Sequence, residues 1–412
     1  MSSSEWKKCK LRDLTIKITK GTTPTTIGHK FVETGVNYIK AESILLDGRI
    51  DPSKFGFISL QTHEKLSRSQ LEENDILFSM AGMVLGKSAV VKKDFLPANT
   101  NQALAIIRLK QEIVDPQFIS YFMKQESFFN YVNYSTGQSA QPNINLEEIG
   151  DLEINLPPLS TQKWITGILS SLDEKTELNR QTNASLEAIA QAIFKEWFVD
   201  FNFPGATGEM VESELGLIPK GWRVGRLGEL IEISNETVKP MNSPELLFSH
   251  YSIPSYDDGL NPIIEAGSAI LSNKYLVKEK SILVSKLNPR IPRIWAINQV
   301  ENENSICSTE FQVFLPIKHF YYSFSYFYLI QQSTIDTMVS KATGTSSSHQ
   351  RINPNDILGL DVIIPNDELI IDFENNIREY FKYLEHNLNE NLLLAKTRDS
   401  LLPKLMIGEI EL

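Results

Sequence analysis

Cysteine is nearly absent from the chain: only Cys9 and Cys307 occur among 412 residues, and they form no Cys-x-x-Cys pair. This usage argues against a disulfide scaffold and a cysteine-based zinc site, and it fits a reducing cytoplasm. The N-terminal stretch MSSSEWKKCKLRD lacks the apolar core of a signal peptide. No apolar run reaches the roughly 18 to 20 residues of a transmembrane helix. The richest run, Phe320–Ile330, is broken by serines and is expected to be a core helix.

Catalytic motifs are equally scarce. The six histidines are scattered without a His-Glu-x-x-His pattern, and no Gly-x-Ser-x-Gly elbow occurs. The segment Ala81–Ser88 fits a loose phosphate-loop pattern, which requires a helix directly after it. Residues Ala89–Pro97 are instead β-branched, then charged, then broken by proline. We expect a glycine-rich hairpin turn there, with ATP binding at Lys87 as the alternative, and we expect no metal site.

The chain contains a tandem repeat. Trp6 and Trp222 open similar segments at an offset of 216, and Ile144–Ile149 matches Ile352–Ile357 at an offset of 208. Short β-type runs and apolar helical patterns fill both copies, which predicts two mixed α+β globular blocks. We place the first block at 1–157, a helix at 158–203, a linker at 204–216, the second block at 217–365 and a second helix at 366–412.

The two helices carry matching heptad stripes. Apolar residues recur every seven positions in both, and the equivalent residues are Ile165, Leu172, Leu186 and Ile193, and then Phe373, Tyr380, Leu394 and Leu401. Asn179 and Asn387 occupy the same missing position, where a polar residue fixes coiled-coil register at some cost in stability. We expect these two asparagines to pair across an antiparallel coiled coil, with solvated side chains as the alternative. Asn366–Glu368 is expected to cap the second helix and Pro403 to end it.

Such helices would space the two blocks widely. About 36 residues at 1.5 Å per residue span roughly 54 Å. One turn of DNA measures about 34 Å, so two blocks held this way could read separate segments of one duplex.

Nucleic-acid signals lie in the second block and in two polar loops. From Lys274 to Arg293 there are six basic residues and one acidic residue, and clustered Lys and Arg supply phosphate and guanine contacts. The loops Ser135–Asn143 and Ala342–Arg351 occupy equivalent places and carry Gln, Asn and Ser. The alternatives are a solvated strand pair and ordinary glycine turns.

At this point the sequence resembles a known family, the specificity subunits of type I restriction-modification systems. The segments that carry the resemblance are the central region Leu156–Ile165, Ile168–Asp173, Asn179–Asn183 and Leu186–Phe201, the opening Glu214–Trp222 of the second block, the C-terminal region Arg398–Glu409 and the turn Gly21–Pro24. The resemblance covers the whole chain and agrees with the repeat.

The resemblance implies a function without catalysis in this chain. Each block would be a target recognition domain that reads one half of a bipartite double-stranded DNA site. The helix pair would set the gap and dock two modification (methyltransferase) subunits. Those subunits would use S-adenosylmethionine (AdoMet) to methylate adenine, and restriction subunits would add ATP- and Mg-dependent translocation and cleavage. No cofactor is expected in this chain. A stand-alone enzyme and a structural coiled-coil adaptor remain the alternatives.

The net charge of −11 at first argues against DNA. However, residues 158–216 and 366–412 carry −5 each, whereas the two blocks carry 0 and −1. The near-neutral blocks can still gather cations on one face. The residues that we predict to contact DNA are Lys87, Gln138 and Gln141 in the first block, and Lys286, Arg290, Arg293, Ser347 and Gln350 in the second.

Overall fold

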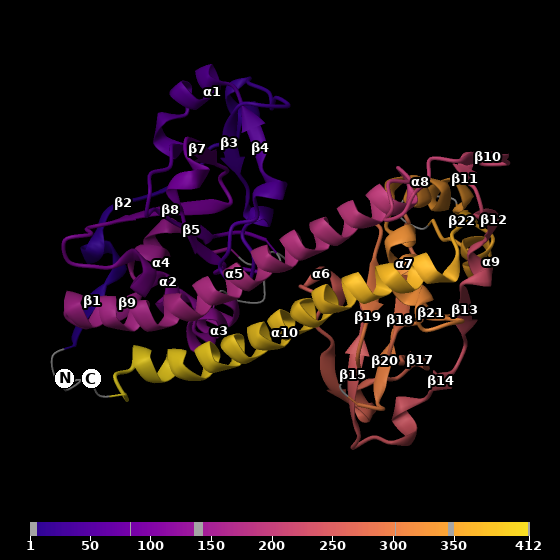
Figure 1. The fold of residues 1–412 in the computed structure, drawn as a ribbon. Helices are drawn as coiled ribbons and strands as arrows, with labels where there is room; N and C mark the ends of the chain where they lie inside the picture. The colour runs from indigo at the N-terminus through magenta and orange to yellow at the C-terminus, as the bar shows by residue number, and fades with distance from the viewer. Residues whose placement is uncertain (1–5, 83, 136–142, 301, 345–349, 411–412) are drawn as a thin grey trace. The chain divides into compact units, whose positions relative to one another are not determined.

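The computed structural model describes residues 6–82, 84–135, 143–300, 302–344 and 350–410 (Figure 1). The chain forms two compact units, one of residues 1–177 with 392–412 and the other of residues 178–391. Each unit therefore contains one globular block together with part of both long helices. No helix among the described residues has the length and apolar character needed to cross a bilayer.

The first unit is built on a four-stranded antiparallel sheet of order β2-β8-β5-β6, beside a three-stranded sheet β4-β3-β7 and the pair β1-β9. Its strands are β1 (Lys7–Lys10), β2 (Thr15–Lys20), β3 (Val36–Ile39), β4 (Gly56–Ile58), β5 (Ile76–Ser79), β6 (Ser88–Val90), β7 (Ala98–Thr100), β8 (Leu104–Leu109) and β9 (Glu153–Leu156). Its shorter helices are α1 (Leu60–Lys65), α2 (Pro116–Lys124), α3 (Glu126–Ser135) and α4 (Leu146–Gly150).

The second unit repeats this plan. Its four-stranded sheet has the order β13-β21-β18-β19, and a five-stranded sheet β14-β17-β20-β15-β16, a hairpin β10-β11 and a pair β12-β22 complete it. The strands are β10 (Met210–Ser213), β11 (Gly216–Pro219), β12 (Arg223–Arg226), β13 (Ile231–Ser234), β14 (Thr237–Val238), β15 (Leu247–Tyr251), β16 (Ile263–Ala266), β17 (Lys274–Leu276), β18 (Ser281–Ser285), β19 (Ile294–Ile297), β20 (Ser305–Cys307), β21 (Phe311–Pro316) and β22 (Asp361–Ile364). The shorter helices are α6 (Ile253–Asp257), α7 (Tyr321–Leu329), α8 (Gln332–Lys341) and α9 (Pro354–Leu358).

The predicted α+β class and the tandem repeat are confirmed, because β2, β8, β5 and β6 stand in the same order as β13, β21, β18 and β19. The expected core helix at 320–330 is α7, in which every residue but Tyr328 is buried. The apolar helical patterns near 118–131 and 322–338, which predict one or two helices in each block, form α2 and α3 in the first unit and α7 and α8 in the second. Alternating apolar strands and buried helices thus give each unit its own core.

The two long helices are α5 (Leu159–Phe198) and α10 (Asp367–Met406). The Asn366 side chain accepts a hydrogen bond from the Leu369 amide at 3.0 Å, so the predicted cap is present. The prediction that Pro403 ends the helix is wrong, because α10 continues to Met406. Leu402, Leu405 and Met406 are buried in the first unit's core, and their burial outweighs the one backbone hydrogen bond that proline cannot donate.

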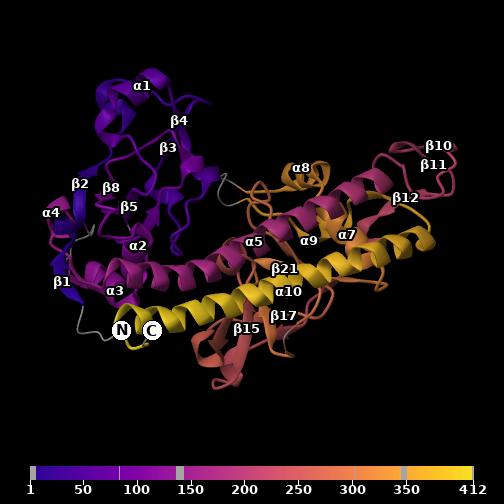
Figure 2. The same ribbon diagram turned by 60° about the vertical axis from the view of Figure 1, so that its left-hand side comes forward.

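In each unit α5 and α10 lie side by side and run in opposite directions (Figures 1 and 2). In the first unit Arg398 pairs with Asp173 at 2.9 Å, while Leu402 and Leu405 join the cluster that contains Ile165. In the second unit Phe373 packs on Phe194 and Phe198. Antiparallel pairing is the arrangement that the heptad stripes predict.

The two seam asparagines do not bond to each other. Asn179 donates to Asn391 at 2.9 Å and to Glu390 at 2.7 Å. Asn387 donates to Asn183 at 2.7 Å. Asn183 and Asn391 are themselves separated by the repeat offset of 208, so the two contacts are copies of one interaction. Both Asn179 and Asn387 are buried, and the duplicated contact gives the helices one preferred register.

We expect Asn387→Ala to lower the stability of the second unit by about 1–2 kcal/mol, since it leaves the Asn183 oxygen without this donor. Urea unfolding checks the value. Asn376 is exposed on the same helix and bonds only to the Asp372 carbonyl, so Asn376→Ala is the control and should be nearly neutral. Equal effects of the two substitutions would show that the seam contact contributes nothing.

A tryptophan near the start of each globular block packs against the segment that follows a long helix. In the second unit Phe203, which follows α5, stacks on Trp222 with ring centroids 5.0 Å apart. In the first unit Trp6, Gly408 and Ile410 line one small hollow after the end of α10. The exit of each helix is thus fixed to the start of a block.

Candidate nucleic-acid interface

In the first unit the turn between β5 and β6 joins a second loop. The hairpin closes with the Ser79 amide donating to the Lys87 carbonyl at 2.8 Å. The Met80 amide donates to the Ala103 carbonyl at 2.8 Å, and the Ile144 amide donates to the Met80 carbonyl at 3.1 Å. The glycine-rich segment is therefore a hairpin turn, and Ile144, which follows the polar loop in sequence, lies beside it.

The second unit repeats these backbone contacts. The Ser285 amide donates to the Arg293 carbonyl at 2.9 Å, and the Lys286 amide donates to the Glu310 carbonyl at 2.8 Å. The Ile352 amide donates to the Lys286 carbonyl at 3.0 Å. These pairs lie at offsets of 206 to 208 from those of the first unit. Both units therefore place a sheet turn beside the residue that follows a polar loop, Ile144 or Ile352, although about 60 residues separate turn and residue in sequence. This juxtaposition is the candidate interface.

Lys87 is engaged within its own unit. Its ammonium donates to the carbonyls of Ala41 and Ile44 at 3.0 and 2.7 Å. Burial lowers its pKa below the usual lysine value, with the Lys54 charge as a smaller cause. The next element is the strand β6, and β5 and β6 pair antiparallel. The helix that a phosphate loop needs is therefore missing, which argues against ATP binding at Lys87.

The predicted cations of the second unit fall into two groups. Arg293 makes a bidentate contact with Asp257 at 2.7 and 2.8 Å, and the Lys286 ammonium lies 5.3 Å from the centre of the Tyr275 ring. Burial lowers the pKa of Lys286. Arg290 is exposed, and within the described part of the chain no hydrogen bond or ion pair engages it. Arg290 is thus the cation of this turn whose charged group is available to bind a ligand.

The predicted amide and hydroxyl residues are only partly placed. Gln350 lies beside the turn, where its carbonyl accepts a hydrogen bond from the Asn288 amide at 2.8 Å. Gln138, Gln141 and Ser347 lie outside the described residues, and their role stays a prediction.

Further residues beside these turns are not among the contacts that the sequence predicts. Arg351 is bound by both carboxylate oxygens of Glu310, at 2.8 and 3.0 Å. In the first unit the Thr22 amide donates to the Thr100 carbonyl at 3.0 Å, and exposed Arg68 donates to the Thr22 hydroxyl at 3.1 Å. Gly21 permits this approach, because a Cβ there would lie 2.2 Å from the Thr100 oxygen. The Gly21–Pro24 turn was the available signal, but its partner loop is about 80 residues away.

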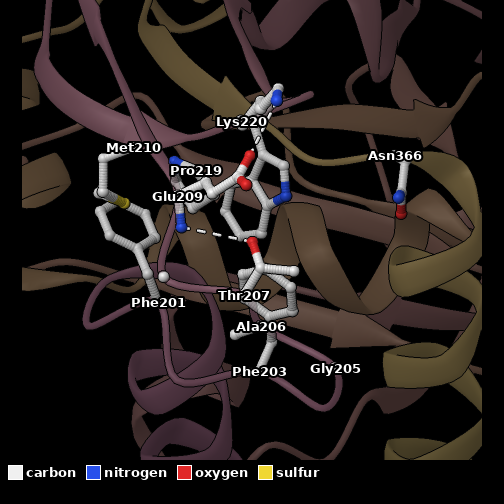
Figure 3. Close-up of a pocket in the computed structure, with 12 residues that line it drawn as sticks. Phe201, Phe203, Gly205, Ala206, Thr207, Glu209, Met210, Pro219, Lys220 and Asn366 are labelled. Carbon is white, nitrogen blue, oxygen red and sulfur yellow. Dashed lines mark hydrogen bonds and ion pairs between the residues drawn. The ribbon is translucent and has the colours of Figure 1, made fainter.

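A separate hollow of about 210 Å³ lies in the second unit, after the end of α5 (Figure 3). Phe201, Phe203 and Trp222 form its aromatic wall, and Glu209 pairs with Lys220 at 2.8 Å. No nucleophile and base meet there. Within the described ranges no cluster of three or more His, Cys, Asp or Glu side chains could hold a metal. We therefore assign no chemistry to this hollow.

Two mixed blocks, each presenting a paired turn and loop and each followed by a long helix, define a bipartite binding protein. Comparison with known proteins agrees. Residues 3–188 and 219–394 match the family of the type I restriction modification DNA specificity domain, and the chain belongs to this family.

Relatives and solved structures cover nearly the whole chain. The specificity subunit of the type I restriction enzyme MjaIX from Methanocaldococcus jannaschii is 25% identical, over 98% of this chain and 94% of that protein. The HindI specificity subunit from Haemophilus influenzae is 23% identical, over 84% and 88%. The crystal structure of a type I restriction-modification S subunit from M. genitalium matches 97% of this chain and 96% of its own, with a TM-score of 0.55 and 15% identity. The last comparison supports the fold.

Proposed function

We propose that this chain is the DNA specificity subunit of a type I restriction-modification complex, in which each block reads one half of a bipartite double-stranded site. The observation that carries the proposal is the duplicated pairing of a sheet turn with a polar loop in a chain that belongs to this family. Side chains on such loops reach base edges, while cations contact phosphates.

The antiparallel helices would set the gap between the two halves. The Asn179–Asn391 and Asn183–Asn387 contacts and the Asp173–Arg398 ion pair favour one register, and a fixed register is what a fixed spacing requires. Exposed apolar side chains such as Leu178, Ile189 and Tyr383 offer contact area on the same helices for two modification subunits.

Chemistry would reside in the partners. Modification subunits would bind AdoMet and methylate adenine, and restriction subunits would use ATP and Mg to translocate and cleave DNA in the cytoplasm. The near-neutral blocks alone would bind DNA weakly, because phosphate contacts dominate affinity. The partner subunits would then supply much of the positive field.

Among the predicted contacts, the structure suggests a division of labour. Arg290 is suited to direct contact. Arg293 and Lys286 are held by Asp257 and Tyr275 and are better suited to shaping the turn and the local positive field. Gln350 contacts the turn through its backbone carbonyl, which accepts a hydrogen bond from the Asn288 amide. Lys87, Gln138, Gln141 and Ser347 remain proposed contacts.

Co-expression with a cognate modification subunit should confer adenine methylation at one bipartite motif, read out by methylome sequencing of the host. Replacing residues 217–365 by the second block of another family member should change one half of the motif and keep the other. Replacing residues 1–157 is the matched reciprocal exchange and should change the opposite half.

Absence of any new methylated motif with a modification subunit that is active alongside its own specificity subunit would contradict the proposed function. Loss of both halves in each exchange, with folding verified by circular dichroism, would contradict the assignment of one block to one half. ATP hydrolysis by the isolated chain that Lys87→Ala abolishes would favour the enzyme alternative.

A further inference from the structure

The turn between β18 and β19 ends in a tip that two prolines stiffen. The Ile291 amide donates to the Asn288 carbonyl at 2.9 Å, and the Asn288 amide donates to the Gln350 carbonyl at 2.8 Å. Asn288 has a φ of 48°, which asparagine tolerates better than most residues. Pro289 and Pro292 have fixed φ angles, and each restricts the residue before it. The tip therefore loses little conformational entropy on meeting a ligand.

Two neighbouring residues of this tip, Arg290 and Ile291, are exposed. Ile291 is 53% exposed and directly follows Arg290 in the chain. Arg290 is exposed and has no ion pair or hydrogen bond within the described residues. The nearby Arg293 and Arg351 are both bound by carboxylates. Of these three arginines, only Arg290 has no carboxylate partner among the described residues. The next residue in the chain is the exposed, apolar Ile291.

This pair matches the major-groove edge of DNA. A guanidinium donates two hydrogen bonds to O6 and N7 of guanine, and an apolar side chain contacts the C5-methyl group of thymine. A ligand that offered phosphates alone would engage Arg290 and leave Ile291 in water. A cation next to an apolar residue on a stiff backbone turn therefore favours base edges over the phosphate backbone.

The corresponding turn of the first unit lacks this chemistry. Its only cation is Lys87, whose ammonium is bound to the carbonyls of Ala41 and Ile44. Gly82 and Gly86 take positive φ values there, 128° and 80°; at the offset of 206 the second turn has Asn288 and Pro292 in their places. The two turns share their backbone contacts but differ in what they present, so the two half-sites should differ as well.

We propose that Arg290 and Ile291 are specificity-determining residues, and that the half-site read by the second block contains a guanine contacted by Arg290 and a neighbouring thymine whose methyl group contacts Ile291. The inference rests on the proposed function and deepens it. It assigns part of the chemistry of the target, which family membership does not provide.

The experiment uses the complex of this chain with its modification subunits and duplexes that carry the methylated motif. Each thymine of the second half-site is replaced singly by deoxyuridine, which removes only the methyl group. Each guanine is replaced singly by 7-deazaguanine, which removes the N7 acceptor. Fluorescence anisotropy gives Kd at one fixed salt concentration, since affinity depends on salt.

For the unsubstituted chain, one deoxyuridine should weaken binding several-fold, and that penalty should vanish with Ile291→Ala. One 7-deazaguanine at a neighbouring position should weaken binding on the order of tenfold, and that penalty should vanish with Arg290→Ala. Methylome sequencing should show the motif relaxed at the same positions, with the first half unchanged.

Ile317→Ala is the matched control, because Ile317 is also about half exposed, at 50%. It follows the end of β21 that is opposite to Phe311, the residue that pairs with Ser285 beside the turn. It should leave both penalties intact. A second half-site made only of A·T pairs, which has no guanine on either strand, or penalties that survive both substitutions, would overturn the inference while leaving the proposed function standing. Uniform weakening of all duplexes by Arg290→Ala would identify a phosphate contact and overturn the guanine assignment. Failure of the unsubstituted complex to methylate any motif would instead reject the proposed function.

Discussion

Replacing Phe194 with alanine is expected to lower the free energy of unfolding of the second unit by about 3–5 kcal/mol. Phe194 is only 2% exposed, and its ring contacts Phe324 and Phe327 of α7 and Phe373 of α10 at centroid distances of 5.5, 6.1 and 5.8 Å. Truncation removes the buried ring, leaves a cavity and deletes several aromatic contacts, each worth about 0.5–1.5 kcal/mol beyond burial.

Hydrogen exchange of α7 amides, measured by mass spectrometry in rising urea, reports the stability of this unit separately. Ile189→Ala on the same helix is the control, because Ile189 is 48% exposed and should change stability by less than about 0.5 kcal/mol. A loss below about 1 kcal/mol for Phe194→Ala would mean that α5, α7 and α10 do not share one core. The loss of stability should also impair methylation of the whole bipartite motif.

Replacing Asp75 with alanine should destabilise the first unit by about 3–5 kcal/mol. The Asp75 side chain is 0% exposed and binds Arg108 through two hydrogen bonds of 2.8 Å each. Its second oxygen also accepts a hydrogen bond from the Glu72 amide at 2.8 Å. Arg108 is only 17% exposed, so the substitution leaves a largely buried guanidinium with one exposed partner, Glu72.

Urea unfolding of Asp75→Ala measures this loss, and Glu72→Ala provides the matched control. Glu72 pairs with the same Arg108 but is 66% exposed, so its removal should cost no more than about 1 kcal/mol. The double variant Asp75→Leu with Arg108→Met should recover most of the stability, because it removes both charges together. The single variants Asp75→Leu and Arg108→Met are measured beside it. A double variant whose loss of stability equals the sum of these two single losses would refute this account.

The sequence predicts best where the pattern is local. The heptad positions from Ile165 to Ile193 define α5 to within a few residues, because helix periodicity depends only on near neighbours. The repeat supplied the rest of the architecture, since the same strand order occurs twice. The helix end at Pro403 was mispredicted because tertiary burial of Leu405 and Met406 decides it, and no local rule includes that burial.

The candidate interface was predicted less completely, for a physical reason. A count of cations between Lys274 and Arg293 treats them alike, whereas their availability depends on distant carboxylates. Asp257 lies 36 residues from the Arg293 that it binds, and Glu310 lies 41 residues from Arg351. Only folding reveals that Arg290 lacks such a partner. The exposed Ile291 was overlooked because apolar residues in a strand-rich region are expected to be buried.

The contacts of Trp6 and Trp222 have a consequence for the order of the chain. Trp222 receives the exit of α5 through the covalent linker, and Trp6 receives the exit of α10 without any covalent link. In both units, therefore, the segment that leaves a long helix packs on the tryptophan near the start of a globular block. A circularly permuted chain that begins in the 204–216 linker, with residues 410 and 6 joined by a short connection, would keep the contacts within each unit that fix the register of the helices. In such a chain the contacts within each unit, and not the order of the gene, would hold each block to its helices.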